Sequence, residues 1–127
     1  MRFLLDTNVL IALAQRARSA PANISAIFDP SNMSFVSAAS LWEIAIKVRL
    51  RKLDAGHALE DLAGYFDAIG LVRLPIDHRY VIAMPDPVPA TRDPFDRLLL
   101  AQCAVEGLRL VTTDRALAGH PLSWQGS

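Results

Sequence analysis

The stretch "FLLDTNVLIALA", residues 3–14, decides how this chain folds. Nine of its twelve residues are apolar, yet Asp6, Thr7 and Asn8 stand together in the middle. Because burying an unpaired carboxylate is costly, the place of Asp6 in an apolar segment needs an explanation. The pattern predicts a short buried strand over residues 2–5, then a polar junction, then a helix within residues 6–17.

The rest of the chain continues this alternation of apolar strand patterns and helical patterns. Strands are predicted at 33–37, 71–75 and 108–113, with a weaker fifth candidate at 122–124. Helices are predicted within 20–32, 37–50, 57–70, 77–84, 94–107 and 114–119. Continuous apolar strands joined by helices are typical of a parallel sheet covered on both faces. The sequence therefore predicts one α/β domain spanning residues 1–127, with a central, mostly parallel sheet of four to five strands.

The composition indicates the class of protein but does not indicate what the protein binds. Apolar residues make up 52% of the chain and charged residues 20%, as in a compact soluble domain. Thirteen Lys and Arg balance thirteen Asp and Glu, so net charge favours neither nucleic acid nor a membrane surface. The only cysteine is Cys103, which excludes an internal disulfide and a cysteine-based zinc site and fits a reducing cytoplasm.

The first residues also have to be tested as a secretion signal. Arg2, the apolar run and "ARSAP" at 17–21 loosely resemble one. However, Asp6 and Asn8 split the apolar core, and no stretch approaches the roughly 18 apolar residues of a spanning helix. We therefore expect a cytoplasmic protein with no membrane association.

Four carboxylates are predicted to meet at one edge of the sheet. Asp6 follows the first strand and Asp114 follows the strand at 108–113, while Glu43 and Asp96 lie on helices that lead away from that edge. Ligands of open parallel sheets bind beyond the carboxyl ends of the strands. Crowded carboxylates repel one another unless they are protonated or neutralised by cations, and such oxygen ligands suit Mg²⁺ or Mn²⁺. The natural chemistry of such a site is metal-dependent phosphodiester hydrolysis.

Each acid also has an ordinary structural explanation. Asp6 or Thr7 fits the N-cap of the first helix. Ser40 and Glu43 match a capping box, and Glu43 has the spacing of an ion pair with Lys47. Further N-caps are predicted at Asp93, directly before Pro94, and at Asp114.

Four motifs together resemble a known family. They are "LLDTNVLI" at 4–11, "SAASLWEIAIK" at 37–47, "RDPFDRLLLAQC" at 92–103 and "LVTTD" at 110–114. Their content and order resemble the PIN-domain ribonucleases, especially the toxins of VapBC-type toxin–antitoxin pairs. The resemblance implies a three-layer α/β/α fold and Mg²⁺- or Mn²⁺-dependent endonucleolytic cleavage of RNA. It also implies a cognate antitoxin partner and a homodimer.

The resemblance assigns roles residue by residue. The catalytic and metal-binding quartet that it implies is Asp6, Glu43, Asp96 and Asp114. Hydrogen bonds from Asn8, Thr7, Thr112 and Thr113 would support these acids. Asp93 stays outside the quartet because helix capping explains it well. Relatives with the "DPFDR" motif often carry a histidine just before the Arg-Asp pair, where this chain has Thr91.

The remaining candidate residues allow either both a functional and a structural interpretation or a structural interpretation alone. Arg92 and Arg97 flank the acids and are placed to meet a substrate phosphate, although Arg97 could equally pair with Asp93 or Asp96. The basic run at 47–52 is explained as well by a solvated helix end as by RNA contact. His57, His78 and His120 are predicted to be surface or capping residues, and Trp42 and Trp124 to be packing residues.

Two other function classes remain open on sequence grounds. The first is a phospho-receiver-like signalling module, which has a similar size and an acidic Mg²⁺ pocket. Such a module needs an aspartate after a central strand, and the mid-chain strand at 71–75 ends in proline without offering one. The second is a PIN-like domain that binds RNA or protein without catalysis, against which the presence of all four acids argues.

Overall fold

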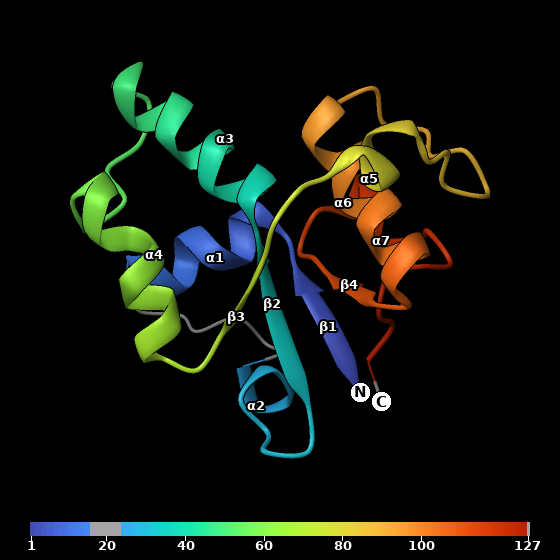
Figure 1. Ribbon diagram of the computed structural model, residues 1–127, viewed down its shortest axis with the longest axis horizontal. Helices are drawn as coiled ribbons and strands as arrows, with labels where there is room; N and C mark the ends of the chain where they lie inside the picture. Colours follow the sequence, from blue (N-terminus) through green and yellow to red (C-terminus); the bar gives the residue numbers. More distant parts are fainter. Residues whose placement is uncertain (16–23, 127) are drawn as a thin grey trace.

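A four-stranded parallel sheet forms the centre of the molecule (Figure 1). The computed structural model describes residues 1–15 and 24–126. The strands are β1 (Arg2–Leu5), β2 (Met33–Ser37), β3 (Val72–Leu74) and β4 (Arg109–Val111). Their order across the sheet is β3-β2-β1-β4, and all three pairings are parallel. The predicted α/β fold with a central parallel sheet is confirmed.

Seven helices connect and cover the strands within the described residues. They are α1 (Thr7–Ala14), α2 (Ile24–Ile27), α3 (Ala38–Arg49), α4 (Leu59–Ala68), α5 (His78–Ile82), α6 (Pro94–Glu106) and α7 (Arg115–Ala118). Each lies inside a predicted helical range. The predicted end of the first helix at 16–17 and the predicted start of the second at 20–23 fall outside the described residues. None of the described helices has the length and apolar character needed to cross a membrane.

Strand alternation divides the core into two layers. Phe3 and Leu5 of β1 belong to a cluster with residues of α1, α3 and α4, while Leu4 belongs to a second cluster with residues of α6 and α7. Because successive side chains of a strand point to opposite faces, one buried strand serves both layers. Figure 1 shows α1, α3 and α4 on one side of the sheet and α5, α6 and α7 on the other. This is the three-layer α/β/α arrangement that the resemblance implied.

The predicted fifth strand at 122–124 is wrong. Ser123 forms an isolated bridge with Leu110 and no more. Local bonds explain this, because the amide of Leu122 donates to His120 Nδ1 at 3.1 Å and the amide of Ser123 donates to the His120 carbonyl at 2.9 Å. These bonds turn the chain beside β4 and occupy the amides of Leu122 and Ser123, so that of the three residues only Trp124 donates to β4, to the carbonyl of Leu110 at 2.8 Å.

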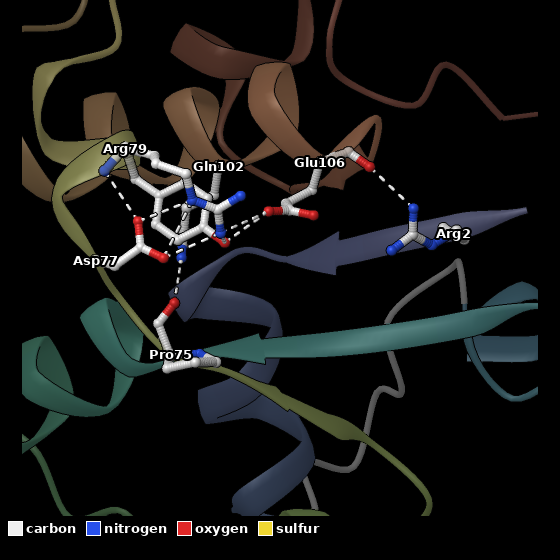
Figure 2. Close-up of polar contacts among 7 residues, drawn as sticks. Arg2, Pro75, Asp77, Arg79, Gln102 and Glu106 are labelled. Carbon is white, nitrogen blue, oxygen red and sulfur yellow. Dashed lines mark hydrogen bonds and ion pairs between the residues drawn. The ribbon is translucent and has the colours of Figure 1, made fainter.

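A polar network fastens α5 and the segment before it to α6. Figure 2 shows Arg79 joined to both Asp77 and Glu106. The guanidinium Nη2 lies 3.0 Å from Asp77 Oδ2 and 3.3 Å from Glu106 Oε1. The hydroxyl of Tyr80 also donates to Glu106 Oε1 at 2.7 Å, and this bond raises the pKa of Tyr80. The network holds α5 in place although its apolar side chains Val81 and Ile82 face solvent.

Candidate functional site

The first two acids flank the point where the strand order reverses. From β1 the chain proceeds to β2 and β3 on one side, and only then returns to place β4 on the other side of β1. Asp6 directly follows β1, and its amide donates to the carbonyl of Val111, the last residue of β4, at 2.9 Å. Asp114 follows three residues after Val111. The edge of the sheet at such a reversal of strand order is where open parallel sheets bind their ligands.

Asp6 is buried, with 4% of its surface exposed, and it is hydrogen-bonded through both oxygens. Oδ1 accepts from the amide of Thr7 at 2.8 Å, as the N-cap of α1, and Oδ2 accepts from the hydroxyl of Thr112 at 2.6 Å. Burial raises the pKa of Asp6, and the negative charges of Glu43 and Asp114 raise it further. These effects outweigh the two hydrogen bonds, so capping and a place in a charged cluster are both true of Asp6.

Asp96 shares this electrostatic environment. It lies in the first turn of α6, where Oδ2 accepts from the hydroxyl of Thr91 at 3.1 Å. Burial, together with the charges of Asp93, Asp6 and Asp114, raises the pKa of Asp96 to about 6. Asp6 thus interacts electrostatically with Glu43, Asp96 and Asp114, and Asp96 also interacts with Asp114.

The acids are close enough to repel one another but are not arranged as ligands around one point. Within residues 1–15 and 24–126, no three His, Cys, Asp or Glu side chains are placed to hold a metal ion together. Two acids are engaged elsewhere, because Glu43 Oε2 lies 3.0 Å from Lys47 Nζ and Asp114 Oδ1 accepts from the amide of Ala116 at 2.9 Å. Each carboxylate still has lone pairs free for a further partner.

The predicted supporting residues divide into those that contact an acid and those that do not. Thr112 does so twice, since its hydroxyl donates to Asp6 and accepts from the amide of Asp114 at 3.0 Å. Thr7 contacts Asp6 through its amide, while its buried hydroxyl donates to Ser40 Oγ at 3.0 Å. Asn8 and Thr113 are exposed, and in the described part of the chain no hydrogen bond joins either to the quartet.

The structure also tests the capping predictions. Asp93 caps α6, because Oδ1 accepts from the amides of Phe95 at 2.8 Å and Asp96 at 3.3 Å, and Asp114 caps α7. The capping box at Ser40 and Glu43 is wrong. Helix α3 begins earlier, at Ala38, with Ser37 as its N-cap, so Ser40 is buried inside the first turn. The ion pair between Glu43 and Lys47 is present.

The two arginines near the acids differ in their hydrogen bonding and in their exposure to solvent. The Nε of Arg97 donates to the carbonyl of Thr91 at 2.7 Å, and within the described residues the alternative pairing with Asp93 or Asp96 is not present. Arg92 is exposed beside Asp93. Of the two, Arg92 is the one whose guanidinium is open to a phosphate.

Sequence reasoning missed two contributors to this site. Thr91 was noted only as a departure from histidine, yet its hydroxyl donates to Asp96 and accepts from the amide of Asp93 at 3.2 Å. Trp42 was predicted to pack, but 61% of its surface is exposed. It contacts the ring of Phe95, at a centroid distance of 5.6 Å. A signal was available, because Trp42 and Phe95 each directly precede a quartet acid.

The predictions for Trp124 and the three histidines have different outcomes. Trp124 packs against Phe3, with ring centroids 5.0 Å apart, as predicted. His120 is buried and not a surface residue; its Nε2 lies 2.8 Å from the carbonyl of Pro87. His78 is exposed, and His57 is partly covered by Tyr65.

Replacing Asp96 by Asn should stabilise the metal-free protein at pH 7. The folded-state pKa of Asp96, about 6, lies above its ordinary value of 3.8, so the charged form is disfavoured in the folded state. The resulting destabilisation is fully present above pH 6 and is lost as the pH falls towards 4. After allowance for solvent screening, we expect a gain of about 1 kcal/mol at pH 7 and almost none at pH 4. Urea unfolding of the parent and the variant in EDTA at both pH values measures this gain in the free energy of unfolding. An equal gain at pH 7 and pH 4 would contradict the prediction.

Comparisons with known proteins agree with this architecture. A model of the family described as "PIN domain" matches residues 3–120. A search of curated proteins finds no match. Among solved structures, the chain is similar to one titled "Crystal structure of VapBC2 from Rickettsia felis bound to a DNA fragment from their promoter", with a TM-score of 0.63 and 14% identity. The alignment covers 97% of this chain and 96% of that one. At this identity the likeness shows a shared fold.

Proposed function

This chain belongs to the PIN domain family, and from that premise we propose that it is a Mg²⁺- or Mn²⁺-dependent endoribonuclease, the toxin of a toxin–antitoxin pair. The observation that carries the proposal is the buried carboxylate of Asp6 at the topological switch point, which interacts electrostatically with Glu43, Asp96 and Asp114. Because the chain belongs to the PIN domain family, it is not a phospho-receiver module. The non-catalytic PIN-like domain becomes an outcome of the test below.

The donor set fits a hard divalent cation. All four groups are carboxylates, and burial, followed by the charges of neighbouring acids, raises the pKa values of Asp6 and Asp96, so that a bound cation would favour their charged forms. Asp6, Asp96 and Asp114 would hold the ion, and Glu43 would join them on leaving Lys47. Such an ion polarises a phosphoryl oxygen and lowers the pKa of bound water.

The surrounding residues would hold the acids in place for this chemistry. Thr112 fixes Asp6 and the backbone of Asp114, which come from opposite ends of the chain. Thr91 fixes Asp96 and, through its carbonyl, Arg97. Arg92 is exposed beside Asp93 and is the proposed contact for a substrate phosphate.

Replacing Thr112 by Val should slow metal-dependent cleavage about 10- to 100-fold. The substitution keeps the shape of the side chain but removes the donor to Asp6 and the acceptor for the amide of Asp114. Loss of a group that orients metal ligands typically has an effect of this size. Initial rates on a defined RNA, with Mg²⁺ titrated, measure it.

The matched control is Thr113→Val, because Thr113 is the exposed neighbour on the same loop. It should cleave within about twofold of the parent, as surface substitutions usually have small effects. Equal rates for the two variants would show that Thr112 does not orient the acids.

The proposal itself is tested by incubating the purified protein with defined RNAs in EDTA, Mg²⁺ or Mn²⁺. We expect discrete internal cleavage with Mg²⁺ or Mn²⁺ and none in EDTA. Cleavage that is independent of metal would contradict the proposed chemistry. RNA binding without cleavage under every condition would favour the non-catalytic alternative.

We also propose a cognate antitoxin, a homodimer and a cytoplasmic location. Exposed apolar side chains support the first two, since Val81, Ile82 and Met84 are each more than half exposed. Beside them, between α5 and α6, lies a cavity of about 320 Å³ lined mostly by apolar residues. A protein partner would remove this surface from water.

A further inference from the structure

An exposed tryptophan contacts a half-buried phenylalanine between the two helices that carry Glu43 and Asp96. Trp42 on α3 contacts Phe95 on α6, with the two ring planes at 73°. Trp42 directly precedes Glu43, and Phe95 directly precedes Asp96. The pair therefore bridges the two helices that carry these acids.

The indole of Trp42 contacts a neighbouring ring, but most of its surface is open to solvent. Phe95 is itself half-buried, and an edge-to-face contact of this kind favours one ring orientation. Nevertheless 61% of Trp42 is exposed, which is unusual for the largest apolar side chain. The protein thus presents an open π-surface on the helix that carries Glu43, in contact with the helix that carries Asp96.

Charge arguments limit how an RNA could bind at this place. The chain has no net charge, and the four carboxylates repel phosphates in the absence of a cation. Of the nearby cations, Lys47 is paired with Glu43 and Arg97 is bonded to a backbone carbonyl, so Arg92 is the exposed one proposed for a phosphate. An uncharged contact would add affinity that these few charges do not supply. Stacking of a base on an aromatic ring is such a contact, and it requires an unpaired base whose face is open.

We propose that Trp42, oriented by Phe95, is the stacking platform for one unpaired nucleobase of the RNA beside the scissile phosphodiester. The inference rests on the proposed ribonuclease function and adds a substrate-binding residue to it. It also requires a single-stranded segment at the cleavage point, because a base stacked within a duplex cannot lie on the indole.

Steady-state cleavage of a short single-stranded RNA in Mg²⁺ tests the role of Trp42. Trp42→Ala should raise KM about tenfold and leave kcat within about twofold, whereas Trp42→Phe, which keeps a π-surface, should stay within about threefold of the parent KM. The matched control is Leu50→Ala, since Leu50 is 59% exposed at the far end of α3, about 12 Å along the helix. Leu50→Ala should leave both constants unchanged.

Binding without cleavage gives a second measurement. In the Asp6→Asn background, adding the single-stranded RNA should quench tryptophan fluorescence, and adding Trp42→Phe should remove most of the quenching, because Trp124 is packed against Phe3. The same RNA annealed to its complement should quench much less. Because stacking is uncharged, the loss of affinity in Trp42→Ala should be similar at low and high salt.

The possible results separate this inference from the function on which it rests. If the parent protein cleaves no RNA, the proposed function itself fails. If the parent cleaves but Trp42→Ala has an unchanged KM, only the stacking role is overturned, even if the variant loses a protein partner. A Trp42→Leu variant with the parent KM would likewise overturn it, because leucine is apolar but offers no π-surface.

Discussion

Replacing Asp6 by Asn is expected to lower metal-dependent RNA cleavage by at least about two orders of magnitude while leaving metal-free stability equal or higher. Asp6 is the most buried of the four acids and interacts with Glu43, Asp96 and Asp114. Neutralising it would remove a proposed metal ligand, and the loss of an orienting group alone typically has an effect of about 10- to 100-fold.

The stability part of this prediction follows from the direction of the pKa shift. The pKa of Asp6 is raised, so above its folded-state pKa the charged carboxylate destabilises the fold, and this effect is lost as the pH falls. Asparagine retains an oxygen that can accept from the amide of Thr7, and its amide group can donate to the hydroxyl of Thr112. Thermal unfolding in EDTA at pH 7 should therefore give a Tm no lower than that of the parent.

Asp29→Asn is the matched control for Asp6→Asn. Asp29 is an exposed aspartate whose pKa is lowered by hydrogen bonds from Ser31, which is the opposite sign. The Asp29→Asn variant should cleave RNA at the rate of the parent and unfold at a slightly lower Tm. A marked fall in Tm for Asp6→Asn would instead show that capping of α1 is the main role of Asp6, and full cleavage would contradict the proposed site.

Replacing Gln102 by Ala is expected to destabilise the protein by about 3 kcal/mol, which is roughly 10 °C in Tm. Gln102 on α6 is fully buried and bonded at both ends. Its Oε1 accepts from the hydroxyl of Ser37 at 2.6 Å. Its Nε2 donates to the carbonyl of Pro75 at 3.3 Å, the contact that Figure 2 shows. The substitution leaves a cavity and a buried hydroxyl without its acceptor.

The comparison for Gln102 is Gln15→Ala. Gln15 also donates through Nε2 to a backbone carbonyl, that of Asp54 at 2.7 Å, but it is exposed. Its loss should change the free energy of unfolding by about 0.5 kcal/mol or less. Urea unfolding of both variants measures the difference, and a loss below about 1 kcal/mol for Gln102→Ala would show that the buried network contributes little.

The elements of the fold were predictable because their signals are local. Strand β2 begins and ends where the apolar run "MSFVS" predicts, and α6 begins at Pro94 and ends before Gly107, which adopts φ 69°. The fifth strand failed because a weak local pattern at 122–124 competed with hydrogen bonds to His120, which nothing in the sequence reveals.

The candidate site was predictable only in part. That Asp6 and Asp114 lie at one edge follows from two apolar runs that each end in an acid, since parallel strands place their carboxyl ends together. The hydrogen bonds of Thr112, the engagement of Glu43 with Lys47 and the exposure of Trp42 depend on side-chain directions, which residue order does not specify.

The opening stretch shows the division between sequence and structure most directly. The sequence by itself determined that residues 2–5 form a buried strand and that a helix begins after Asp6, because apolar periodicity and capping act over a few neighbouring residues. Only the tertiary structure decided that Asp6 is both a cap and a member of a repelling acidic cluster. Burial and Coulomb repulsion depend on distances through space, and those join β1 to β4, α3 and α6.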